Sequence, residues 1–104
     1  MEIEFKKSTR KGKKFMIIFH DEGKRSKTIH FGSSANKDFT IYSKEDKKVA
    51  EERKRLYLIR HAPREDWTKP DNAGSMSRWI LWNKPSVGAS LKDYMRRFKL
   101  KLKK

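Results

Sequence analysis

All three tryptophans of the chain lie within residues 65–98, beside glycine, proline and asparagine residues and among many basic ones. A tryptophan side chain buries a large area and has a rigid shape, so three of them this close together need a core or a partner to cover them. Only 35% of the 104 residues are hydrophobic, so apolar material is scarce elsewhere. Residues 65–98 therefore mark where this protein builds its core or holds a partner, and we assign Trp79 with Ile80 to the core.

The first third of the chain has the pattern of β-strands. Residues 2–6 and 26–31 alternate polar and apolar side chains, and residues 14–20 form a short apolar run rich in strand-forming types. Turn residues separate the three segments, which predicts a three-stranded antiparallel meander.

The rest of the chain has the pattern of helices. Ser43 is the expected N-cap of a long helix that ends near Arg60, before Ala62-Pro63. A short helix is expected from Ser75 or Ser77 through Trp82. The expected apolar stripe of the long helix is Val49, Leu56, Tyr57 and Ile59.

The last expected helix is capped by Ser86 or Ser90 and has the clearest helical period in the chain. Its apolar positions are Val87, Leu91, Tyr94, Met95 and Phe98. Strands followed by helices predict an α+β fold, with about three helices on one face of a small sheet. We expect one domain over residues 1–98, followed by a basic tail at 99–104 that is either an edge strand or a free arm.

Positive charge is spread over the whole chain. The formal net charge is +15, from 28 Lys and Arg against 13 Asp and Glu. Residues 1–30 carry nine basic and four acidic residues, residues 31–60 carry eight and five, and residues 61–104 carry eleven and four. Because such a charge repels itself in a small domain, it indicates a polyanionic partner. We expect nucleic acid first, then an acidic protein surface or an anionic membrane surface.

Several classes of site and location are disfavoured by the residue types. There are no cysteines, so disulfides and thiolate metal sites cannot form. The three histidines, His20, His30 and His61, fit no zinc spacing, and we expect neither a metal nor a cofactor. No apolar run is long enough to cross a membrane, and residues 1–14 lack the apolar segment of a signal peptide. We expect a protein of the cytosol, the nucleus or a particle assembled there.

Basic residues gather on the expected long helix and around the end of the last one. Lysine and arginine contact phosphates without reading bases, while exposed aromatic rings stack on bases. No base-reading motif is present, so we expect binding without sequence specificity. The candidate nucleic-acid-binding residues are Lys47, Lys48, Arg53, Lys54, Arg55, Arg64, Trp67, Arg96, Arg97, Lys99 and Lys101.

Two other functions remain open. Ile80-Leu81-Trp82 is apolar nearly all round, and an exposed Trp82 or Trp67 would anchor a protein interface. The chain would then be a minor capsid or cementing subunit that binds an acidic coat protein. A metal-dependent nuclease using Glu65 and Asp66 is a third alternative. Because no catalytic motif accompanies these carboxylates, we expect no enzyme and assign no catalytic residue.

Several short blocks of the sequence carry a family resemblance. They include His30-Phe31-Gly32, Asp38-Phe39-Thr40, Arg60-His61, Glu65-Asp66-Trp67, the segment SRWILWNKPS at residues 77–86, Asp93-Tyr94 and Arg97-Phe98. The pattern covers about residues 14–100 and resembles an uncharacterised family of small basic proteins encoded by large nucleocytoplasmic DNA viruses of algae and protists. That family has no assigned chemistry, so the resemblance supplies no functional residue. It implies a viral origin and a structural role in the virion.

Charge and resemblance together predict a non-enzymatic virion protein that binds polyanions, above all viral DNA. Its expected location is the virion, and the host cytoplasm or nucleus during assembly.

Overall fold

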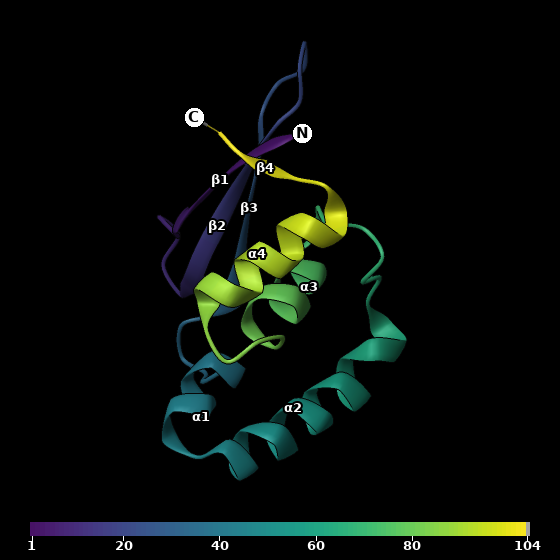
Figure 1. Ribbon diagram of the computed structural model, residues 1–104. Coiled ribbons are helices and arrows are strands. Elements are labelled where there is room, and N and C mark those ends of the chain that lie inside the picture. The colour runs from purple at the N-terminus through teal and green to yellow at the C-terminus, as the bar shows by residue number, and fades with distance from the viewer. Residues whose placement is uncertain (104) are drawn as a thin grey trace.

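The computed structural model describes residues 1–103 and confirms an α+β architecture. A four-stranded sheet packs against α3 and α4 on one face, while α1 and α2 lie beyond one end of the sheet (Figure 1). None of the helices within the described residues combines the length and the apolar character needed to cross a membrane. The elements are β1 Glu2–Lys7, β2 Lys13–His20, β3 Lys27–Ser33, α1 Phe39–Glu45, α2 Lys47–His61, the 3-10 turn η1 Ala62–Arg64, α3 Ala73–Met76, the π-helical turn η2 Ser77–Leu81, α4 Val87–Phe98 and β4 Lys101–Leu102.

The sheet contains the predicted antiparallel meander and one strand more. β1 pairs with β2, and β2 with β3, both antiparallel. The prediction of three antiparallel strands is right only in part, because β4 adds to β1 in parallel and makes the sheet four-stranded and mixed. The Lys101 amide donates to the Met1 carbonyl (3.1 Å) and the Lys103 amide to the Ile3 carbonyl (2.9 Å). Lys101–Leu102 is therefore an edge strand, and Lys104 lies outside the described residues.

The core lies between the sheet and the C-terminal helices. Successive side chains of a strand point to opposite faces of the sheet, so every second side chain faces α3, η2 and α4. The Tyr94 ring of α4 is completely buried, and its hydroxyl donates to the Pro70 carbonyl (2.8 Å). The apolar stripe predicted for α4 packs against this core. The buried cluster is Ile3, Ile17, Phe19, Phe31, Met76, Ile80, Leu81, Tyr94 and Leu100.

Two helices replace the single long helix expected from Ser43. Asp38 caps α1 and accepts hydrogen bonds from the Thr40 and Ile41 amides, so the helical structure begins at Phe39, before Ser43. Asp46 breaks the run with extended backbone and caps α2. Each aspartate satisfies amides that a helix start leaves without partners. Ser43 is thus an internal residue of α1 and not a cap.

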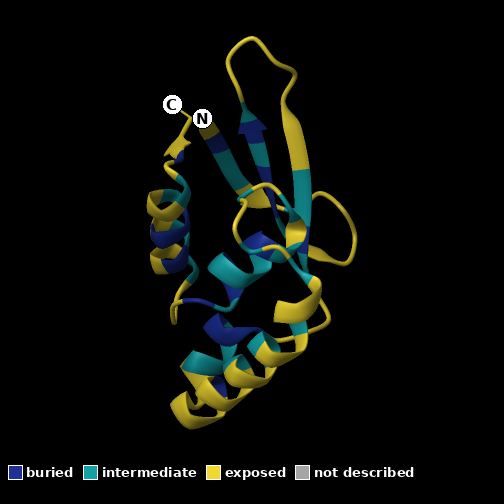
Figure 2. Ribbon diagram, turned by 90° about the vertical axis from the view of Figure 1, so that its right-hand side faces the viewer, coloured by how far each residue is buried: buried dark blue, intermediate teal, exposed yellow. Residues whose placement is uncertain are grey.

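Three of the four residues of the apolar stripe expected on α2 are not covered by the body of the protein. Val49, Leu56 and Ile59 are 43%, 40% and 62% exposed, and much of α2 is exposed in Figure 2. The helix is instead held through Ala50, which is buried, and Tyr57, which is half-buried. The reason is that α2 lies beyond the end of the sheet, where the rest of the protein offers little apolar surface for these side chains to pack against.

The C-terminal helices begin at side-chain caps. Asn72 accepts a hydrogen bond from the Ser75 amide (2.8 Å) and starts α3, so neither Ser75 nor Ser77 is the cap. Ser86 caps α4, as one of the two sequence alternatives predicted, and Ser90 is buried inside the helix. Lys99 has φ 55° and ends α4 in the left-handed conformation typical of that position.

Candidate functional site

The basic residues predicted on α2 do not form a single phosphate-binding face. Lys47 and Lys48 are exposed and border a shallow hollow that Glu51 and Glu52 also line. Arg55, in the same hollow, pairs with Glu52 at 2.6 Å. The acidic residues reduce the positive potential of this face, because charges this close offset each other.

Lys54 is engaged in holding α2 to the C-terminal half. Its ammonium group donates to the Asn83 carbonyl (2.8 Å) and lies 4.7 Å from the centre of the Phe39 ring. Burial lowers the pKa of Lys54, and the nearby Arg78 adds to that effect. A lysine held in this way acts as a structural contact between α1, α2 and the segment after η2.

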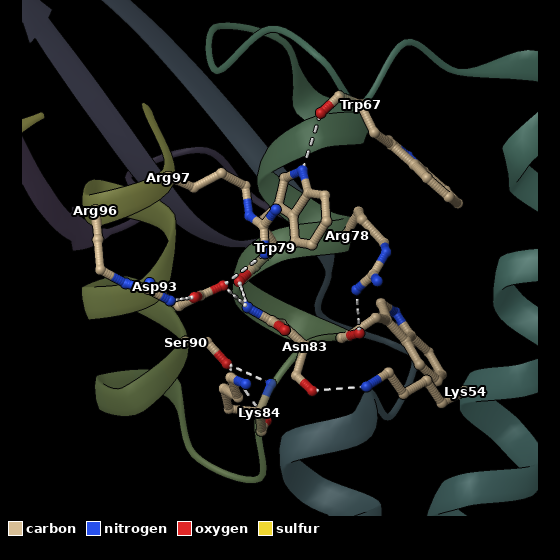
Figure 3. Close-up of polar contacts among 11 residues, drawn as sticks. Lys54, Trp67, Arg78, Trp79, Asn83, Lys84, Ser90, Asp93, Arg96 and Arg97 are labelled. Carbon is tan, nitrogen blue, oxygen red and sulfur yellow. Dashed lines mark hydrogen bonds and ion pairs between the residues drawn. The ribbon is translucent and has the colours of Figure 1, made fainter. Parts of the chain in front are cut away.

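Two of the predicted cations on α4 are tied to Asp93. Arg96 and Arg97 both donate to its carboxylate, and Asn83 donates to it at 2.7 Å (Figure 3). Burial of the carboxyl opposes ionisation, but these hydrogen bonds outweigh it and hold the pKa of Asp93 below its usual value. The arrangement fixes α4 against the end of η2.

Trp79 lies between two arginine side chains. The guanidinium carbons of Arg97 and Arg78 are 3.7 and 4.2 Å from its ring centre, and Figure 3 shows them on opposite sides of the indole. The indole nitrogen donates to the Trp67 carbonyl (3.0 Å). Trp79 packs against the core cluster and is half-buried, and the contacts of Arg97 are accounted for within the fold.

Trp67 and Trp82, the two candidate interface residues, are also half-buried. The Trp67 indole nitrogen donates to Glu65 (2.9 Å), and its ring centre lies 5.5 Å from the Arg78 guanidinium. Trp82 stacks on Tyr57 of α2, with ring centres 4.5 Å apart and planes inclined by 6°. Both residues join α2 and its flanking loop to the C-terminal half of the chain.

The remaining predicted cations are scattered. Arg64, in η1, and Lys99, after α4, are exposed, as is Lys101 in β4. Of the predicted cations, Arg53 alone lines the concavity beside the sheet.

That concavity is a cleft of about 700 Å³ between β3, the loop at residues 34–38, α2 and η2. Its floor includes Phe31 and Leu81 of the core. Segments far apart in the sequence form its walls, since β2, β3, α1, α2 and η2 all contribute. Besides Phe31, the charged and aromatic side chains lining it are Lys13, Lys14, Lys37, Asp38, Tyr42, Arg53, Tyr57, Arg60, His61, Glu65 and Trp82.

Positive charge predominates in the cleft. Lys14 is paired with Asp38 (2.6 Å), and Lys37 reaches Glu45 (2.9 Å). Lys13, Arg53 and Arg60 form no ion pair within residues 1–103. Because the walls hold these cations on facing elements, the cleft concentrates a positive potential that each residue alone would not create.

The sequence did not single out most of this cleft. Lys13, Lys37 and Arg60 come from β2, a loop and α2, and no local pattern links them. Tyr42 and Tyr57 were assigned no binding role. One signal was present, since Tyr57 lies four residues from both Arg53 and His61 and so shares their helix face.

The carboxylates of the nuclease alternative have local partners. Glu65 accepts from Trp67, and its second oxygen lies 3.4 Å from His61 Nδ1. Asp66 accepts from the Thr68 amide (2.9 Å) and hydroxyl. Within residues 1–103, no three His, Asp or Glu side chains are grouped as a metal site requires.

The fold and cleft define a small basic α+β protein with an aromatic, cation-lined groove beside its sheet. Residues 3–61 match the family described as "Family of unknown function (DUF5754)", and because this is more than half of the chain, the protein belongs to that family. The matched range runs from β1 through α2 and includes most of the residues that line the cleft, while the SRWILWNKPS segment lies beyond it. No curated protein and no solved structure matches the chain.

Proposed function

We propose that this protein binds nucleic acid without sequence specificity and that the cleft is its principal phosphate-binding surface. The observation that carries the proposal is the convergence of Lys13, Arg53 and Arg60 on one concavity, with no acidic partner for any of them among the described residues. Cations without intramolecular partners are available to bind phosphates, and when they bind they displace the counterions condensed on the nucleic acid.

The net charge of +15 supports the same proposal at longer range. A strongly positive small protein attracts polyanions from solution, and its association rate falls as salt screens the charge. The proposed role is structural and non-enzymatic. Location in a virion rests on the resemblance of the sequence blocks within about residues 14–100, SRWILWNKPS among them, to proteins of large DNA viruses.

The proposal is tested by measuring nucleic-acid affinity over a salt series. The wild-type protein is expected to bind a labelled duplex tightly at 50 mM salt and to lose affinity steeply toward 200 mM. A triple variant, Lys13→Gln, Arg53→Gln and Arg60→Gln, is expected to bind more weakly, with the slope of log affinity against log salt reduced by about 2 to 3.

A matched control removes the same charge elsewhere. Lys24, Arg25 and Lys92 are exposed and do not line the cleft, so changing all three to glutamine should reduce affinity less than the cleft variant does. Absence of binding at 50 mM salt would refute the proposed function. Equal losses in the two triple variants would refute the cleft as the principal surface.

A second candidate function is contact with an acidic protein, as in a minor capsid subunit. The observation that favours it is the exposure of Val49, Leu56 and Ile59 on α2, because apolar side chains at helical spacing are normally covered. Lys48, Arg53 and Arg60 are exposed on the same helix, so an acidic partner would complement the charge. Capture of a coat protein from disrupted virions that survives nuclease treatment, and that is lost in Ile59→Glu, would support it.

A further inference from the structure

We propose that the cleft takes up an unpaired nucleobase of a single-stranded nucleic acid, stacked between Tyr42 and Arg53, with its neighbouring phosphates on the other cations of the cleft. The inference rests on the proposed function and narrows the expected ligand from any nucleic acid to an unpaired strand. It follows from a comparison of which aromatic rings of this protein already have a close neighbour on their faces and which do not.

Most of the polar aromatic rings have a close partner on at least one face. Tyr57 and Trp82 stack at 4.5 Å, and Tyr57 also stacks on His61 at 4.3 Å. Trp79 has guanidinium groups at 3.7 and 4.2 Å. Contacts this short leave no space for a further ring on those faces.

Tyr42 differs from these rings. Its nearest ring neighbour among the described residues is Trp82, with centres 6.4 Å apart and planes inclined by 46°, which is not a close stack. The cationic groups of Arg53 and Lys37 stand over it at 5.7 and 5.8 Å from its centre. The ring is half-buried and lines the cleft, so it is fixed in place and still reachable.

The spacing above Tyr42 is close to what an intercalated base needs. Two van der Waals contacts, ring to base and base to guanidinium, require about 7 Å. Arg53 is 5.7 Å away and exposed, so its flexible side chain needs to withdraw by only about an ångström. The base would then lie between an aromatic ring and a cation, an arrangement typical of proteins that bind single strands.

Phosphates beside such a base would meet positive charge on both walls. Arg60 lies on α2 and Lys13 on β2, both without an acidic partner among the described residues, and Lys37, which also reaches Glu45, lies on the loop after β3. A volume of about 700 Å³ is in the range of small-molecule sites and suits one nucleotide. A duplex keeps its bases stacked inside, so it can reach the cations of the rim but not the ring of Tyr42.

The test compares single-stranded and double-stranded DNA of equal length with the full chain at fixed salt. The wild-type protein is expected to bind the single strand more tightly. Tyr42→Leu is expected to weaken single-strand binding about tenfold, the effect of losing one stacked base, and to leave duplex binding unchanged. Tyr42→Phe keeps the stacking face and is expected to bind both as the wild type does.

A free nucleotide shares the chemistry of the proposed ligand, and a competition experiment separates the two. Thymidine monophosphate is expected to displace the single strand only at millimolar concentration, since it lacks the flanking phosphates. Displacement at concentrations at which the strand itself binds would overturn the proposal in favour of a free nucleotide.

The outcomes separate this inference from the broader proposal. The inference is overturned if the wild-type protein binds single strand and duplex equally, or if Tyr42→Leu binds the single strand as tightly as the wild type does. Either result leaves the proposed non-specific binding of nucleic acid intact. No binding of either DNA at low salt removes both. If Tyr42→Leu fails to fold, as judged by its thermal unfolding, Tyr42→His serves in its place, because its smaller ring should give an intermediate single-strand affinity with unchanged duplex binding.

Discussion

The indole of Trp82 and the phenol ring of Tyr57 stack face to face, with centres 4.5 Å apart and planes inclined by 6°. Tyr57 belongs to α2, and Trp82 directly follows η2. Tyr57 is half-buried, and this burial raises the pKa of its hydroxyl well above the usual value. This stack holds α2 in place as a wall of the cleft.

Changing Trp82 to leucine should therefore loosen α2 and destabilise the protein by about 2 kcal/mol, through lost burial and lost ring stacking. Denaturant unfolding measures the effect. In a double-mutant cycle with Tyr57→Leu, the coupling energy should be about 1 kcal/mol. Additive effects of the two changes would mean that the stack contributes nothing beyond burial.

Replacing Gly32 with alanine should destabilise the fold by about 2 kcal/mol. Gly32 has φ 79°, and an added Cβ would stand 2.7 Å from Leu81 Cδ1 and 3.3 Å from Lys14 Cβ. Gly88 in α4 is a matched control, because an added Cβ there meets nothing within 4 Å and its φ is not positive. Gly88→Ala should leave the unfolding midpoint unchanged or raise it slightly, and equal effects at the two sites would contradict the account.

Loss of the Asp38 carboxylate should lower the free energy of unfolding by more than loss of an ordinary helix cap does. Asp38 caps α1 and also pairs with Lys14 at 2.6 Å, both side chains being almost fully buried. Asp38→Ala should destabilise by about 3 kcal/mol, because Lys14 is left buried without a partner. Asp46→Ala removes an exposed cap of the same geometry and should cost about 1 kcal/mol. Similar unfolding free energies for the two variants would show that the ion pair adds no stability.

Stability should fall in acid partly through Asp93. Its pKa in the folded protein lies below the ordinary value of 3.8, so the ionised form is favoured by folding. Its contribution is complete above that value and is lost as pH falls through the lower, folded-state pKa. Thermal unfolding between pH 6 and pH 2 should therefore show a smaller acid-induced drop for Asp93→Asn than for the wild type.

The asparagine variant should also be less stable than the wild type at neutral pH by about 2 kcal/mol, since hydrogen bonds from Arg96 and Arg97 to a buried carboxylate are lost. Asp21→Asn, at an exposed turn, is the matched control and should retain the wild-type profile. An unchanged pH profile in Asp93→Asn would exclude this carboxylate as a source of acid sensitivity.

The alternation of residues 2–6 and 26–31 and the apolar run at residues 14–20 were enough to predict β1, β3 and β2, and the helical period of residues 87–98 was enough to predict α4 and its buried face. These predictions succeed because local geometry and burial impose the same period. The prediction at residues 43–60 failed because Asp38 and Asp46 are helix caps whose effect depends on backbone conformation. Val49, Leu56 and Ile59 were placed inward from their spacing alone, and spacing does not say whether a surface exists to cover them.

Local sequence patterns could not predict the candidate site, for a different reason. Lysines and arginines are visible in the sequence, and so is the excess of charge that points to a polyanion. Which of them have partners is a matter of distance: Arg55, Arg96 and Arg97 reach carboxylates, while Lys13, Arg53 and Arg60 do not within the described residues.

The amino-acid sequence alone was sufficient to predict the charge, the α+β class, most of the strands and helix α4, because composition and periodicity are local properties of the chain. Tertiary packing decided that β4 joins the sheet, that α2 stands away from the core, and that Tyr42 lines a cleft with cations above it. Those features depend on residues from distant segments meeting in space, and the free energy of such meetings comes from burial and pairing that no single segment contains.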